Sequence, residues 1–252
     1  MPEALRFSPW DWTLIAVVSV HAAVIAYAYQ PKWKALLLSL PVPFTLATLA
    51  VGRPVDATNA LGLILLLGFV HAVRLLHYNL HLPIVPAIAV SAACYCAAGS
   101  AASPLVPATE TAFWLGAGAA VAVAAVVYRL TPRKVEPGHR TPLPVWIKLP
   151  AVALVIVLIV VIKSYLRGFM TTFPMLAVIT AYEARHSLWT ICRQISVVAI
   201  VLMLLMLACR LGQNHIGLAP SLAVGWGLFL AVMIPYTRYQ WSRPPAGQQG
   251  DD

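Results

Sequence analysis

The chain has 252 residues, of which 61% are hydrophobic and only 10% are charged. An ordinary soluble domain is about 45–50% apolar and about 25% charged, so this composition leaves too few polar side chains to cover a surface exposed to water. The net charge of +9 does not indicate nucleic acid, because the basic residues stand at the ends of apolar segments, as they do in membrane proteins. The sequence therefore predicts an integral membrane protein whose partner is the lipid bilayer, with no nucleic-acid partner.

A membrane-spanning helix needs roughly 20 mostly apolar residues. The first apolar run reaches that length directly after Glu3 and Pro9, so we expect no removable signal peptide. In chain order, nine segments are candidates: 12–29, 35–51, 58–76, 82–101, 111–128, 145–162, 165–182, 188–211 and 216–236. We therefore predict an all-α, polytopic membrane protein with about nine transmembrane helices. Residues 131–144 are expected to form a basic cytoplasmic loop, and residues 241–252 a disordered tail.

The distribution of Lys and Arg predicts the orientation. With the N-terminus outside, twelve of these residues, from Lys32 to Arg243, fall at cytoplasmic ends, and five fall at outer ends. Because cytoplasmic ends attract positive charge, we expect a plasma (inner) membrane protein with its N-terminus outside and its C-terminus in the cytoplasm.

Two segments share an order of residue types at the same spacing. Lys34 is followed by Ala35 and, seven places on, by Pro41; Arg167 is followed by Gly168 and, seven places on, by Pro174. We interpret them as equivalent positions of a duplicated unit. The first four-helix repeat would cover residues 1–102, the linking helix with its basic loop 103–143, and the second repeat 144–240. One linking helix inverts the second repeat, an arrangement typical of secondary transporters.

The prolines inside the second and seventh expected helices define the candidate site. A proline removes a backbone hydrogen bond, and in lipid the freed carbonyl must find another partner. The prolines with their neighbouring hydroxyls could be structural kinks, or they could form a paired polar site between the repeats. The candidate substrate-binding residues are Ser39, Pro41, Pro43, Thr45, Thr171, Thr172 and Pro174, with Lys34 and Arg167 at opposite mouths.

Other polar residues carry weaker indications. Lys34 and Arg167 could equally anchor helix ends at the headgroups, and Glu183 with Arg185 is expected to form a solvated interfacial pair. His21 and His71 are candidates for a proton relay, although a hydrogen-bonded buried histidine is the simpler interpretation. Haem needs two such pairs in a four-helix bundle, so we expect no cofactor, and the four scattered cysteines predict no metal site.

The second half resembles the GlpM-type family of small membrane proteins. The resemblance rests on Tyr165, Gly168, Phe173, Pro174, Ala177, Ile179 and Tyr182, and it is more dilute in the first half, where Ala35 and Leu40-Pro41 take the corresponding places. Family members are usually single four-helix units, so a fused, inverted pair departs from them. The resemblance implies an association with glycerol use and exopolysaccharide production, without an enzymatic activity or catalytic residues.

The sequence contains no phosphate-binding glycine-rich loop, no H-E-x-x-H and no G-x-S-x-G, so we do not expect an enzyme. We expect a transporter or flippase for a polar or anionic small molecule or a lipid-linked sugar. The alternative is a non-catalytic scaffold or accessory subunit of a polysaccharide or respiratory assembly. The protein could act as a homodimer or within a larger membrane complex.

Overall fold

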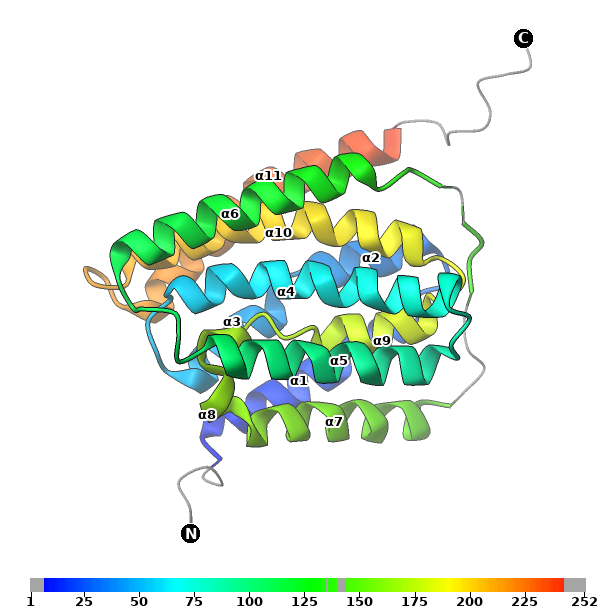
Figure 1. The fold of residues 1–252 in the computed structure, drawn as a ribbon, viewed down its shortest axis with the longest axis horizontal. Helices are drawn as coiled ribbons and strands as arrows, with labels where there is room; N and C mark the ends of the chain where they lie inside the picture. The colour runs from blue at the N-terminus through cyan, green and yellow to red at the C-terminus, as the bar shows by residue number, and fades with distance from the viewer. Residues whose placement is uncertain (1–6, 135, 140–143, 243–252) are drawn as a thin grey trace.

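The computed structural model describes residues 7–134, 136–139 and 144–242 of the chain, and the helices run along its long axis (Figure 1). The first half contains α1 (Pro9–Tyr27), α2 (Pro31–Ser39), α3 (Val42–Val51), α4 (Ala57–Arg74) with a π-helical continuation η2 (Leu75–Asn79), α5 (Ile84–Ala102) and α6 (Glu110–Leu130). The second half contains α7 (Val145–Val161), α8 (Lys163–Leu166), the 3-10 turn η3 (Arg167–Met170), α9 (Met175–Glu183), α10 (Leu188–Gly212) and α11 (Leu218–Ser242).

The described residues form helices and connections without a strand, and seven helical stretches are long and apolar enough to cross a membrane. They are α1, α2 with α3, α4 with η2, α5, α6, α10 and α11. Two of the nine expected spans are not among the seven. Helix α7 is only 17 residues long, and the segment 165–182 is not one helix, because it is interrupted between η3 and α9.

Both interruptions occur at a proline that the sequence singled out. Pro41 and Pro174 are the N-cap residues of α3 and α9, so each stands at the start of a new helix and not inside a kinked one. A proline cannot donate the backbone hydrogen bond of a helix interior, and it disfavours the helical conformation of the residue before it. The preceding helix therefore stops before each proline.

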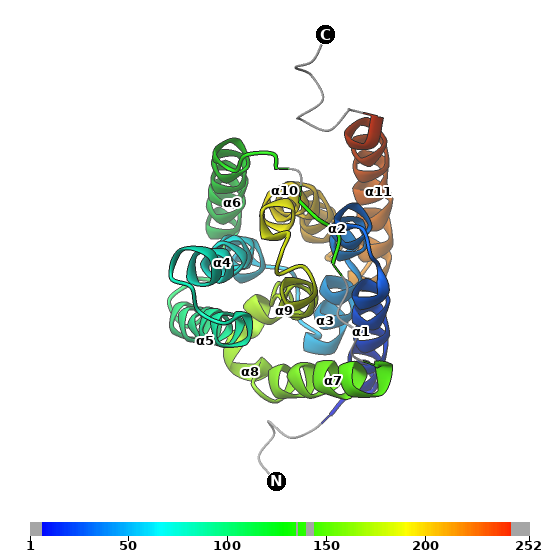
Figure 2. The ribbon, with the colours of Figure 1, turned by 90° about the vertical axis from the view of Figure 1, so that its right-hand side faces the viewer.

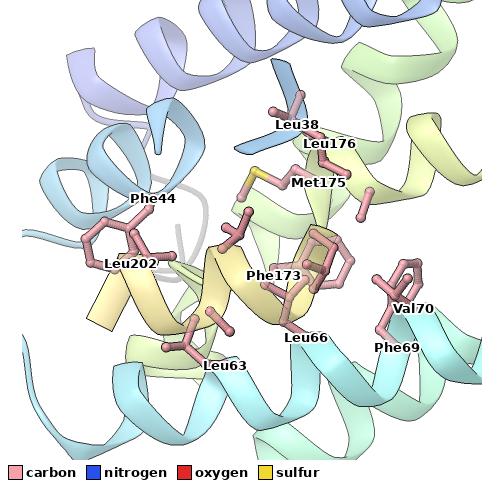
Figure 3. Packing of buried hydrophobic residues seen from close by; sticks show 14 of the residues in the cluster. Leu38, Phe44, Leu63, Leu66, Phe69, Val70, Phe173, Met175, Leu176 and Leu202 are labelled. Atoms are coloured by element: carbon pink, nitrogen blue, oxygen red, sulfur yellow. The ribbon is translucent and has the colours of Figure 1, made fainter. Parts of the chain in front are cut away.

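Helix α9 lies at the centre of the bundle. In the end-on view, the other helices surround it (Figure 2), and it contacts α1, α2, α4, α5 and α7. The buried core follows this arrangement. In Figure 3, Phe173 and Met175 of the second interruption lie among Leu66 of α4, Leu202 of α10 and Phe44 of α3. The two interrupted helices are thus covered by the long continuous ones.

The two halves of the chain contact one another through several pairs of helices. Helix α1 contacts α7, and α4 contacts α10. The interrupted segments cross-contact as well, since α2 touches α9 while α3 touches η3. In each half the helix after the interruption packs on the interruption of the other half, because α4 contacts η3 and α10 contacts α2.

The expected loop and tail agree only in part with the structure. The described residues between α6 and α7 are not helical. Helix α11 continues through Trp241 to Ser242, so these two residues do not belong to a tail, and residues 243–252 lie outside the described part of the chain.

Candidate functional site

The two helix interruptions meet at one small cavity of about 60 Å³. Its lining includes six of the candidate site residues, namely Ser39, Pro41, Pro43, Thr171, Thr172 and Pro174. Most of the other lining residues are apolar, among them Leu66, Ile195 and Leu202. A cavity of this size has room for a few water molecules, but ligand pockets for small organic molecules are about 300–1,000 Å³.

The second interruption is held by the first turn of α4. The Asn59 amide donates to the hydroxyl of Thr171 at 2.8 Å and to the Gly168 carbonyl at 3.4 Å. The Gly168 N–H donates to the hydroxyl of Thr58 at 3.1 Å. Asn59 also accepts the N–H of Asp56 at the N-cap of α4. The Asn59 amide therefore completes the N-terminal cap of α4 and also holds the turn at residues 168–171 in the second half of the chain.

Helix α5 holds the same turn from another side. The buried Tyr95 hydroxyl donates to the Phe169 carbonyl at 2.8 Å and lies 3.0 Å from the hydroxyl of Thr172. Close approach to α4 requires glycine at position 62, since a Cβ atom there would overlap the Thr172 hydroxyl oxygen. The hydroxyls of Thr171 and Thr172 are thus already hydrogen-bonded within the protein.

The first interruption is held from α10 and α11. The buried Gln194 amide donates to the Ser39 hydroxyl at 2.6 Å, and Ser39 in turn donates to the Ala35 carbonyl at 2.7 Å. The Thr45 hydroxyl donates to the Pro41 carbonyl and accepts the indole N–H of Trp226, both at 2.8 Å. Thr45 is not among the residues that line the small cavity.

Lys34 lies at the end of the bundle where α9 ends, and it is almost completely buried, with 1% exposure. Its ammonium group donates to the carbonyl oxygens of Glu183 at 2.8 Å and His139 at 2.7 Å. The Glu183 side chain is buried as well, so the expectation of a solvated Glu183–Arg185 pair is wrong. Glu183 is the last residue of α9, whose other residues are mostly apolar and buried. The ammonium group of Lys34 lies at the C-terminus of this helix, where a positive charge is stabilising.

Arg167 lies at the opposite end of the bundle from Lys34 (Figure 1). It is exposed and has a left-handed backbone, with φ of 49°. Its guanidinium donates to the Ser103 carbonyl at 3.1 Å. Of the two basic residues expected at the mouths of a pathway, only Arg167 is therefore at a surface.

The two histidines expected to form a relay have separate partners. The His21 Nε2 lies 3.0 Å from the Leu37 carbonyl, at the end of α2. His71 bonds to the Leu67 carbonyl of its own helix at 3.0 Å and lies 3.4 Å from the Thr131 hydroxyl. Helix α9 stands between the helices that carry them (Figure 2), so the structure does not bring His21 and His71 together.

A third histidine lies beside the buried lysine. The ring of His139 is 4.7 Å from the ring of His186, centroid to centroid. Burial lowers the pKa of His139, and the neighbouring charges of Arg185, His186 and Lys34 lower it further, while Glu183 acts in the opposite direction. His139 therefore stays neutral over more of the pH range than an exposed histidine.

A larger cavity of about 360 Å³ opens at the same end of the bundle, and we call it the vestibule. The residues that line it come from the start of α2, the connection after α6, the first turns of α10 and the end of α11. Its charged lining residues are Lys32, Arg133, Lys134, Glu136 and Arg193. Because Gln194 lines the vestibule and Ser39 lines the small cavity, their hydrogen bond lies between the two cavities.

Sequence reasoning missed Asn59, Tyr95, Gln194 and the vestibule. An indirect signal existed for three of them, because an amide or a phenol within an apolar span needs a hydrogen-bond partner. The sequence could not say which partner, since Asn59 and Thr171 are 112 residues apart and Gln194 and Ser39 are 155 apart.

Comparisons of the chain with models of protein families, with curated proteins and with solved structures give no match.

Proposed function

We propose that this protein is a membrane transporter or flippase for a polar or anionic small molecule or a lipid-linked sugar. The observation that carries the proposal is that the two interrupted helices line one cavity, next to a larger vestibule. Interrupted helices that meet near the middle of the membrane are the usual substrate and ion sites of secondary transporters. The proposal includes no enzymatic activity.

We further propose two inverted repeats and nine membrane crossings. The element order supports this, since α1, α2–α3, α4 and α5 are matched by α7, the segment of α8, η3 and α9, α10 and α11, with α6 between them. The contacts between the halves support it too, because exchanging corresponding elements turns the α4–η3 contact into α10–α2 and the α2–α9 contact into η3–α3. The two amides follow the same exchange, with Asn59 on one interruption and Gln194 on the other.

The small cavity is too tight to hold a metabolite, so the proposed transport cycle requires movement. We assign initial binding to the vestibule, which lies within the size range of ligand pockets. The Gln194–Ser39 bond is then the barrier between the vestibule and the inner cavity. A rocking motion of one repeat against the other changes contacts at their shared interface and would break this bond. Because the bond lies between the two cavities, its loss would join them.

One observation favours the alternative function, a non-catalytic scaffold. The hydroxyls at both interruptions are bonded internally, and the lining of the small cavity is mostly apolar. A protein that never opens would show the same satisfied hydrogen bonds. The two functions therefore differ in whether the inner cavity ever becomes accessible to water.

An uptake screen tests the transporter. Purified protein in liposomes would be offered glycerol-related and anionic metabolites, and we expect at least one class to enter faster than into protein-free liposomes. Transport of none of them, by protein that is correctly folded and inserted, would favour the scaffold.

Cysteine labelling tests the orientation. In a variant without native cysteines, Arg53→Cys and Pro137→Cys would each be exposed. With the N-terminus outside, an impermeant reagent applied to intact cells labels position 53, and position 137 reacts only after permeabilisation. Labelling of both positions from one side would exclude the inverted arrangement.

A further inference from the structure

The vestibule combines a ligand-sized cavity with an excess of positive charge. Four basic side chains line it, together with one acidic residue, Glu136. The carboxylate of Glu136 is engaged elsewhere, since it accepts the backbone N–H groups of Trp189 at 3.1 Å and Thr190 at 2.6 Å, in the first turn of α10. This carboxylate caps the helix start, where negative charge is stabilised, and so offers little compensation to the basic side chains.

Arg193 is oriented before any ligand binds. Its Nη1 donates to the Thr131 carbonyl at 2.6 Å and to the Tyr128 carbonyl at 3.4 Å, and the guanidinium lies 4.1 Å from the centroid of the Tyr128 ring. A guanidinium has five N–H donors, so those on Nε and Nη2 remain for a ligand. A planar donor held in this way matches the geometry of a phosphate or a carboxylate.

Two further cations have no such engagement. Lys32 and Arg133 are exposed, and neither has a hydrogen bond or an ion pair with the described residues. Basic residues at a membrane face are expected from topology alone. These two differ from such residues because they converge with Arg193 on one cavity that also offers the amide of Gln240 and the apolar surfaces of Leu36 and Trp241.

We infer that the vestibule is a binding site for a phosphate group carried by a small molecule, and that Lys32, Arg133 and Arg193 donate hydrogen bonds to this phosphate. Three cationic donors suit a phosphate, which has three acceptor oxygens and about two negative charges, better than a carboxylate with one charge. The apolar surfaces would contact the organic part. The phosphate could belong to a soluble phosphomonoester or to a lipid headgroup, and only its identification as transported cargo rests on the proposed function.

Titration of the protein with inorganic phosphate tests the site. The protein would be placed in nanodiscs of phosphatidylcholine at constant ionic strength, and binding followed by the fluorescence of its tryptophans, of which Trp189 and Trp241 line the vestibule. We expect saturable binding that chloride does not reproduce. The double variant Lys32→Gln/Arg133→Gln should bind about tenfold more weakly, since hydrogen bonds to charged groups are lost.

The matched control is Arg129→Gln/Arg238→Gln. These residues are exposed, lie near the same end of the bundle and do not line the vestibule. The control loses the same charge but no side chain of the vestibule, so it should retain binding within about twofold. General electrostatic attraction falls equally in both variants, and any larger loss in the test variant therefore comes from direct contacts. Equal weakening in both variants, or binding that does not saturate, would overturn the inference.

Nanodiscs containing phosphatidic acid distinguish the two sources of phosphate. If lipid headgroups occupy the site, phosphatidic acid should compete with inorganic phosphate in the wild type. If the natural ligand is soluble, the binding of inorganic phosphate should be the same with and without phosphatidic acid. Because binding is measured without a gradient, phosphate binding without uptake would leave the site standing and remove the transporter. Uptake of a compound without phosphate binding would support the transporter and overturn the phosphate site.

Discussion

Gln194 and Ser39 are joined across the two halves of the chain by a hydrogen bond of 2.6 Å, between a vestibule and a small inner cavity. Both side chains are buried. The bond stabilises the resting protein. In the proposed transport cycle it also closes the path between the two cavities, because the two side chains belong to different helices of the moving interface.

A double-mutant cycle measures this bond. Ser39→Ala leaves the Gln194 amide buried without its acceptor, which costs about 1–3 kcal/mol, and Gln194→Leu removes the donor. We expect the double variant to be less destabilised than the two single changes predict together, because they share one interaction. Apparent Tm values in detergent provide the measurement. Strict additivity would show that the bond contributes nothing to stability.

Gly62 tests the close contact between α4 and the second interruption. Gly62→Ala would drive a methyl group into the hydroxyl oxygen of Thr172, and we expect a destabilisation of about 1–3 kcal/mol from overpacking. Gly68→Ala is the control on the same helix, because nothing lies within 4 Å of its new Cβ. That change should stabilise α4 slightly, since alanine favours helix by up to about 1 kcal/mol over glycine. Similar thermal unfolding of the two variants would contradict the packing described.

Pro174 tests whether the interruption is needed for function. Pro174→Ala restores a backbone donor and lets the helix extend toward η3, so we expect loss of uptake with normal insertion and folding. Pro235 lies inside the continuous helix α11, and Pro235→Ala should leave uptake unchanged. If both variants transport as the wild type does, the interruption serves only to shape the bundle.

Lys34 and Lys32 form a natural pair of buried and exposed lysines two residues apart. Lys34→Met leaves the carbonyl oxygens of Glu183 and His139 without this donor, and we expect a loss of about 1–3 kcal/mol for each unsatisfied group. Lys32→Met should change the apparent Tm little. A Lys34→Met protein as stable as the wild type would show that these contacts are replaced by water.

His139 should make stability depend on pH. Its pKa is lowered from the ordinary value of 6.5 by burial and by the nearby positive charges, so below 6.5 the unfolded chain takes up the proton more readily than the folded protein. The contribution of neutral His139 to the free energy of unfolding is complete above pH 6.5, and it is lost as the pH falls from 6.5 through the folded-state pKa. We expect the apparent Tm of the wild type to fall in this window relative to that of His139→Gln. Parallel pH profiles would contradict the shift.

The sequence alone determined the helical, membrane-type composition and the positions of both interruptions. These features are local. Hydropathy is summed over one segment, and a proline lacks its N–H whatever surrounds it. The pairing of Pro41 with Pro174 across one cavity was also accessible, because the spacing of residue types repeats. The nine crossings and the inverted repeats remain predictions.

Only the tertiary structure decided which polar groups serve the site. Apolar segments carry little information on which face packs against which neighbour, so the burial of Lys34 and Glu183 could not be predicted from their place at helix ends. The hydroxyls near the prolines bond to carbonyls of their own segments, as Ser39 does to Ala35, and they also bond to another part of the chain. Asn59, Tyr95 and Gln194 supply these second partners, and they reach the interruptions because α4, α5 and α10 pack against them. The vestibule has the same origin, since its lining combines residues from α2, α10, α11 and the connection after α6 that are distant in sequence.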